Sequence, residues 1–348
     1  MQGGASGAVI VAGRPTSSLL YTAVLQQGEL KMPPEGSLSK SEIANLKHWI
    51  EQGAGMPDAG VQVRRSEIDW DAARRHWAFR PLNSEPPPQV AGAHAAWPTN
   101  SIDLYVLAQL QSRQLSPSPP ADPATLVRRV TLDLTGLPPT PAQIQWYEQS
   151  PTPRRFAQLV DQLLASPAYG ERWGRHWLDV ARYADSNGLD ENIAHGNAWR
   201  YRDYVVAAFN EDLPYDAFVE QQLAGDLLDH ASPRDRRRHL IATGYLTLGP
   251  KVLAEVDEAK MEMDIIDEQI DTVGKSLLGL TLGCARCHDH KFDPITTKDY
   301  YALAGIFKST RTMEHFTKIA RWNEVSLPKT PQEEAAVEQI TDNIASVK

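Results

Sequence analysis

Two cysteines and a histidine form the motif with the most specific chemistry in this sequence. Cys284 and Cys287, the two cysteines of the 348-residue chain, are separated by two residues, and His288 follows directly. This C-x-x-C-H spacing is that of covalent c-type haem attachment, in which each thiol adds to one vinyl group of the porphyrin and the histidine binds the iron. The spacing therefore predicts a haem c site with His288 as the proximal iron ligand.

Other uses of the same residues remain open. Cys284, Cys287, His288 and His290 could bind zinc or iron without a porphyrin. The two thiols could also form a redox disulfide or simply be buried, inert groups. A haem iron would need a second axial ligand or an open position. Methionines and histidines could supply that ligand, and the candidates are Met261, Met263, His176, His195 and His315.

Carboxylates stand close to the motif. Asp289 or Asp293 could orient a ligating histidine through its other ring nitrogen. The plainer interpretation is that Asp289 caps a helix and that Asp293 with Pro294 makes a turn. Both interpretations are kept as hypotheses.

A second group of polar residues lies further upstream. His176 and Asp179 fall on one side of a predicted helix, and Asp185 follows at its end. They could act as ligands or as general acid and base, which would make the chain a hydrolase-like enzyme using His176 and Asp185. The plainer interpretation is a helix histidine between two bulky apolar residues, with its hydrogen bonds satisfied, followed by a C-cap loop at residues 185–188.

The composition limits the classes of protein. Hydrophobic residues make up 42% and the net charge is −9, which favours a soluble globular protein and argues against a nucleic-acid partner. No apolar run approaches the roughly 20 residues that span a bilayer. The polar, glycine-rich opening is unlike a signal peptide, and we expect the chain to be part of a longer protein.

The hydrophobic periodicity and the proline content predict a mainly α protein. Residues 1–57 form a small helical unit, 58–100 a proline-rich linker and 101–230 a helical domain. The segment 76–79 is expected to be extended. Ser39 with Glu42 predicts a capping box, and Thr140 before Pro141 predicts a helix start.

The elements around the cysteines are predicted to be helices. A long helix over 253–280 would bury an apolar stripe and expose an acidic face, which is expected to be solvated. Gly283 then allows an unusual backbone conformation before Cys284. A second helix follows the motif, with Tyr300, Leu303 and Phe307 on one side.

Three runs in the larger domain resemble the planctomycete-type cytochrome c-like family of unknown function. They are residues 280–295, containing Cys-Ala-Arg-Cys-His-Asp-His-Lys-Phe-Asp-Pro, residues 133–139, Asp-Leu-Thr-Gly-Leu-Pro-Pro, and residues 175–188, Arg-His-Trp-Leu-Asp-Val-Ala-Arg-Tyr-Ala-Asp-Ser-Asn-Gly. The resemblance covers about residues 100–315, which implies one larger, irregular helical domain over 101–315 and the start of a following region at 316–348. It implies an exported, periplasmic or cell-surface protein that carries haem c and exchanges electrons with a redox partner. The alternative is a zinc, iron or disulfide-stabilised binding module, tied to polysaccharide use.

The N-terminal unit resembles the second half of the small cytochrome c domain that precedes this family's domain. The matching runs are 6–7, 11–15, 18–20, 31–34 and 46–53. In such a domain the methionine before Pro-Pro is the distal iron ligand, which implies that role for Met32. The C-x-x-C-H of that domain is absent, so the resemblance implies that Met32 is the ligand of a missing haem.

Overall fold

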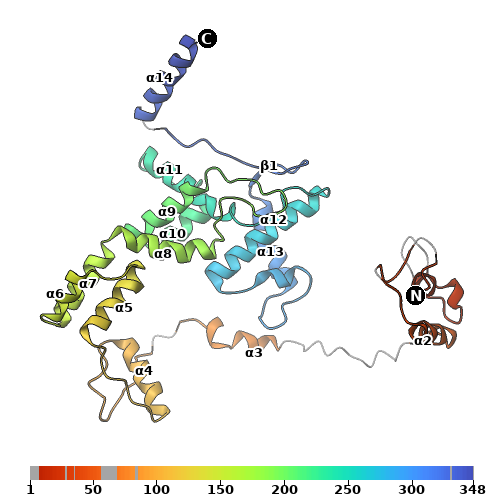
Figure 1. Cartoon of the computed structure of the whole chain (residues 1–348), viewed down its shortest axis with the longest axis horizontal. Helices are drawn as coiled ribbons and strands as arrows, with labels where there is room; N and C mark the ends of the chain where they lie inside the picture. The colour runs from red at the N-terminus through yellow and green to blue at the C-terminus, as the bar shows by residue number, and fades with distance from the viewer. Residues whose placement is uncertain are drawn as a thin grey trace. The chain divides into compact units, whose positions relative to one another are not determined.

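The computed structural model describes residues 8–27, 30–34, 36–55, 69–82, 85–329 and 331–347. Within these ranges the chain forms fourteen α-helices and one two-stranded sheet, which confirms the predicted mainly α class (Figure 1). The chain divides into two compact units, Met1–Asp69 and Trp70–Lys348. Residues 58–68 and 83–84 of the predicted linker lie outside the described residues.

The first unit consists of short helices around a small core. Its elements are η1 (Pro15–Ser17), α1 (Leu19–Val24) and α2 (Lys40–Glu51). The predicted capping box is confirmed, because the Ser39 side chain accepts the Glu42 N–H while the Glu42 carboxylate accepts the Ser39 N–H at 2.8 Å. Met32 is exposed, and its N–H donates to the Ala23 carbonyl at 3.0 Å. The role of Met32 as an iron ligand stays a prediction.

The second unit opens with α3 (Trp70–Arg74), η2 (Trp77–Phe79) and α4 (Ser101–Ser112). The expectation of an extended segment at 76–79 is wrong. His76 Nδ1 accepts the N–H of Ala78 at 3.4 Å, and this local hydrogen bond favours one turn of 3-10 helix over an extended chain.

A recurrent start signal organises the next helices, since each begins with a proline directly after a polar cap. They are α5 (Pro123–Thr135), α6 (Pro141–Glu148), α7 (Pro153–Leu164), α8 (Pro167–Val180) and, later, α11 (Pro233–Ala242). Proline suits the first helical position because its missing N–H would have no partner there. At α6 the predicted start is confirmed, and Thr140 forms a capping box with Gln143. Much of the proline content therefore marks helix starts.

At the centre of this unit α8 packs against α9 (Ala198–Asn210) and α9 against α11, while α10 (Tyr215–Ala224) packs against α11 and η3 (Thr243–Leu246) (Figure 1). Gly170 lets α8 and α9 approach closely, since a Cβ there would lie 2.5 Å from the Val206 carbonyl oxygen. Aromatic side chains fill the core between these helices, among them Trp177, Tyr201 and Phe218.

The cysteine motif lies between two further helices of the second unit. They are α12 (Glu258–Val273), which continues into one π-helical turn, η4 (Gly274–Leu278), and α13 (Thr297–Lys308). The predicted helix over 253–280 therefore begins too early, because Asp257 caps α12 by accepting the N–H of Lys260. Its predicted apolar stripe is buried at Met261, Ile265, Ile266 and Ile270 but not at Leu278, which is 58% exposed. The chain then forms β1 (Met313–His315), β2 (Arg321–Trp322) and α14 (Pro331–Val347).

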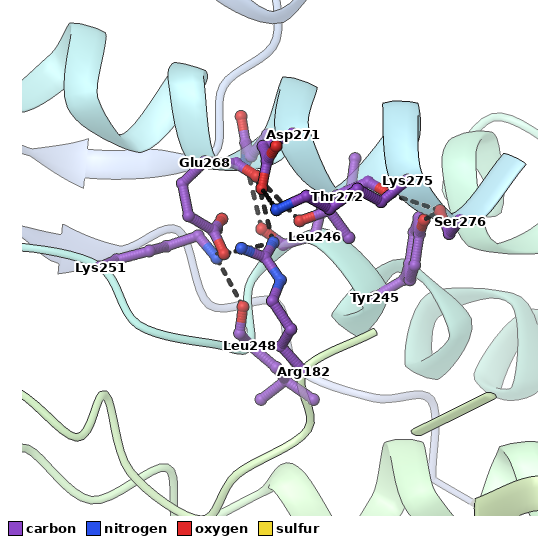
Figure 2. A network of polar contacts seen from close by, with 11 residues as sticks. Arg182, Tyr245, Leu246, Leu248, Lys251, Glu268, Asp271, Thr272, Lys275 and Ser276 are labelled. Carbon is purple, nitrogen blue, oxygen red and sulfur yellow. Dashed lines mark hydrogen bonds and ion pairs between the residues drawn. The ribbon is translucent and has the colours of Figure 1, made fainter. Parts of the chain in front are cut away.

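A buried polar cluster joins α12 to the centre of the unit. Glu268 of α12 contacts Arg182, which follows α8, and Lys251, which follows η3, each at 2.5 Å (Figure 2). Lys251 Nζ also donates to the Leu248 carbonyl at 2.5 Å, and the Lys251 side chain is fully buried. We call these three residues the Glu268 cluster.

Candidate functional site

The two cysteines lie on one exposed turn. The turn is η5 (Leu282–Arg286), a 3-10 helix between α12 and α13 with Cys287 as its C-cap. Side chains three residues apart lie on the same side of a 3-10 turn. Both cysteines are free and exposed, so both thiols are accessible to a common ligand.

Arg286, between the cysteines, anchors the turn to both neighbouring helices. Its guanidinium contacts Asp264 at 2.7 Å and Asp267 at 3.4 Å, both on α12. Its carbonyl accepts the Tyr301 hydroxyl of α13 at 3.2 Å. Ala285 is fully buried in the same core as Leu282. These contacts with α12 and α13 fix the turn, while the side chains of both cysteines stay exposed to solvent.

The acidic face of α12 serves this anchor. Partial burial alone would raise the pKa of Asp264, but hydrogen bonds from Arg286 and Lys260 outweigh it and hold the pKa below its usual value. Burial and a hydrogen bond to Asp267 raise the pKa of Tyr300. The expectation that this face is simply solvated is therefore wrong, since two of its carboxylates bind Arg286.

The two histidines of the motif have different hydrogen-bond partners. His288 is exposed, and its Nδ1 lies 2.8 Å from the Asp289 carbonyl oxygen. A carbonyl only accepts, so Nδ1 carries the proton and Nε2 keeps its lone pair. An imidazole held by a backbone carbonyl at one nitrogen and free at the other is a common arrangement for a metal ligand.

His290 is instead buried and engaged at both nitrogens. Its Nδ1 accepts the N–H of Asp293 at 2.8 Å and that of Phe292 at 3.3 Å, and its Nε2 lies 3.3 Å from the Thr281 hydroxyl. The His290 N–H donates to the Ile295 carbonyl. His290 and Asp293 therefore stabilise the turn at residues 290–295, and a ligand role for His290 would require these bonds to break.

The other predicted sites are a bare metal site, the pair of His176 and Asp185, and a distal iron ligand, and their residues are not found together in the part of the chain that the structure describes. Among the residues that the structure describes, no three His, Cys, Asp or Glu side chains lie together as a metal site. His176 packs edge-on against Trp173, and Asp179 pairs with Arg175 at 2.9 Å. Asp185 accepts the Tyr183 hydroxyl at 2.8 Å. No contact between His176 and Asp185 is found within the described ranges. Met261, a candidate distal ligand, is fully buried with Leu253 and Met313.

The Glu268 cluster was missed by reasoning from the sequence. Burial lowers the pKa of Lys251 to about 8, although Glu268 favours the charged amine. The local signal was weak, since a single lysine after Gly249-Pro250 has no motif around it. Gly249 offered a partial clue: it has φ +91°, and a Cβ there would lie 2.9 Å from Glu268 Oε1.

Lys251 is expected to make stability rise with pH between about 8 and its usual pKa of 10.5. In this window the unfolded lysine keeps its proton while the folded amine has lost it, so a higher pH favours the folded state. Urea unfolding at pH 7.5, 8.5 and 9.5 checks this for the wild type and Lys251→Met. The difference in free energy of unfolding should grow by up to about 1.4 kcal/mol per pH unit. A constant difference would contradict the lowered pKa.

One known family matches a part of the chain that includes the cysteine turn. The model of the family described as "PSCyt2: Protein of unknown function (DUF1549)" matches residues 101–312, which is more than half of the chain. The chain belongs to this planctomycete cytochrome-like family of unknown function. No curated protein and no solved structure matched the chain. Among the described helices, none combines the length and apolar character required to cross a bilayer.

Proposed function

We propose that the chain is an exported haem c protein that transfers electrons to or from a redox partner. Cys284 and Cys287 would hold the porphyrin and His288 would bind the iron. One observation carries the proposal: two free thiols and an imidazole with an available Nε2 are exposed on one turn, while His290 is engaged elsewhere.

The residues around the turn fit this group. A haem requires apolar surface beside its two thioether bonds. Tyr301, whose hydroxyl donates to the Arg286 carbonyl, is 49% exposed, and Phe292, which follows Cys287 in the sequence by five residues, is 75% exposed. When bound, the haem would supply a one-electron redox centre. The chain's own part is to fix the turn through Arg286 and to keep the proton of His288 on Nδ1, which leaves Nε2 for the iron.

A bare zinc or iron site is less favoured by the same geometry. It would need His290 turned toward the two sulfurs, yet His290 Nδ1 accepts two backbone N–H groups. Breaking these bonds would leave buried polar groups without partners, at a cost of about 1–3 kcal/mol each.

Expression in the periplasm with a c-type maturation system tests the proposal. We expect a Soret band and a pyridine haemochrome that survive denaturation, with about one haem per chain. The double variant Cys284→Ala/Cys287→Ala should lose all covalent haem. His288→Ala should change the absorption spectrum, whereas the matched variant His230→Ala, at an exposed loop position, should leave it unchanged.

The absence of haem in the matured protein would overturn the proposal. If metal analysis then found zinc or iron in the wild type, and less of it in the cysteine double variant, the binding-module alternative would replace it. A disulfide between Cys284 and Cys287, found by thiol counting before and after reduction, would favour the disulfide-stabilised form of that alternative.

A further inference from the structure

The Glu268 cluster carries more positive than negative charge. Arg182 and Lys251 share the single carboxylate of Glu268, whose side chain is 10% exposed. Besides Glu268, the charge that affects the pKa of Lys251 is that of Arg182, which lowers this pKa as burial does. Within the described residues, the Arg182 Nε is buried without a hydrogen-bond partner. Because Lys251 is fully buried and Arg182 only partly exposed, an excess of one positive charge here is costly unless an anion approaches it.

An unpartnered histidine lies next to this excess charge. His195 Nε2 is buried and has no hydrogen-bond partner within the described parts of the chain. Burial lowers the pKa of His195, the charge of Lys251 lowers it further, and Asp185 acts in the opposite direction. The backbone N–H of His195 donates to the Asp185 carbonyl oxygen at 2.7 Å, which fixes the position of this residue. The unpartnered Nε2 is therefore the ring nitrogen that remains for a ligand beside the buried ammonium group.

Trp322 connects these groups to the surface. Its ring lies 5.8 Å from Lys251 Nζ and 6.2 Å from the His195 ring. The same tryptophan lines a hollow of ≈ 320 Å³ together with Arg311, Glu314, Arg321, Asn323 and Glu324. Neither arginine of this hollow forms an ion pair with a described carboxylate. Cationic side chains thus lie both at the surface and beneath the Trp322 ring.

The backbone holds the cluster residues close together. Arg182 has φ +55° as the residue directly after the C-cap of α8, and a left-handed residue is a common way to end a helix. Gly249 permits the close approach of the chain to Glu268, as described above.

We propose that this region is a second ligand site, which binds an oxyanion of the carboxylate or phosphate class beside Trp322. Arg321 receives the anion at the hollow, and Lys251 and His195, which lie close to the Trp322 ring, stabilise it through the positive charge of Lys251 and the unpartnered Nε2 of His195. The site shares no residue with the cysteine turn, so the proposal does not depend on whether the protein binds haem.

Histidine NMR of the full chain tests the site. The protein is labelled with ¹⁵N-histidine, and His195 is assigned with the variant His195→Gln. Sodium phosphate and sodium acetate are titrated separately at constant ionic strength. We expect a saturable shift of the His195 signal and a higher His195 pKa, because a nearby anion favours the protonated ring. A response to phosphate alone or to acetate alone would identify the class of ligand, and either one supports the site.

Charge-removing variants make the test specific. Arg321→Gln should weaken binding about tenfold or more, since it removes a charge-assisted hydrogen bond. Arg154→Gln, at an exposed arginine of α7, is the matched control and should bind like the wild type. Lys251→Met should abolish binding and raise the His195 pKa in the absence of anion, because it removes a nearby positive charge.

Two results would overturn the proposal. One is the absence of a saturable His195 response to both anions. The other is equal affinity in the wild type and Arg321→Gln, which would mean that the anions act through general screening. If Lys251→Met does not fold, the exposed Arg321 position still decides the question.

Discussion

Replacing Glu268 by alanine is expected to lower the free energy of unfolding by about 3–5 kcal/mol. The change leaves the fully buried Lys251 ammonium and the partly buried Arg182 guanidinium without their carboxylate. Removal of one partner from a buried ion pair costs far more than the pair contributes, because the remaining charge is neither paired nor hydrated. Urea denaturation of the wild type and the variant, followed by far-UV circular dichroism, measures the loss.

Glu262→Ala provides the matched control on the same helix. Glu262 pairs with Lys308 at 3.3 Å, and both side chains are partly exposed. Solvent-accessible pairs of this kind contribute about 0–1 kcal/mol. Equal losses in the two variants would show that Glu268 has no special role, and a loss below about 1 kcal/mol for Glu268→Ala would contradict its burial as described.

Gly225→Ala is expected to destabilise the second unit by about 3 kcal/mol or more. Gly225 follows α10, and a Cβ there would lie 2.2 Å from the His239 carbonyl oxygen of α11. That oxygen belongs to the backbone, so α10 and α11 would have to move apart to admit the methyl group. Thermal unfolding and expression yield of the soluble protein measure the effect.

A glycine in open space gives the opposite expectation. Gly305 lies within α13, and no heavy atom is within 4 Å of a Cβ built there. Gly305→Ala should therefore stabilise by about 0.5–1 kcal/mol, since alanine loses less backbone freedom on helix formation. If Gly225→Ala were as well tolerated as Gly305→Ala, the close packing of α10 on α11 would be wrong.

Features that depend on neighbouring residues could be predicted from the sequence. The capping box at Ser39 and the helix start at Pro141 each need only a few adjacent residues, and both are confirmed. The location of the cysteine motif between two helices follows from the same local patterns. The start of α12 was predicted five residues too early, because the apolar stripe does not reveal that Asp257 caps it.

Features that depend on distant residues could not be predicted. Glu268 meets Arg182, 86 residues earlier, and the sequence offers no periodicity that would pair them. The different roles of His288 and His290 follow from backbone partners that exist only in the folded turn. For the same reason the acidic residues of α12 looked like a solvated face, although Asp264 and Asp267 bind Arg286.

The anchoring of the cysteine turn also bears on the order in which the chain folds. Arg286 is 22 residues from Asp264 and 15 from Tyr301, so α12, η5 and α13 form contacts that are local in sequence. Loops of this length close at a low entropic cost. The Arg182–Glu268 contact closes a loop about four times longer. We therefore expect residues 258–308 to assemble early and on their own, so that the thiols are in place before the remaining helices pack.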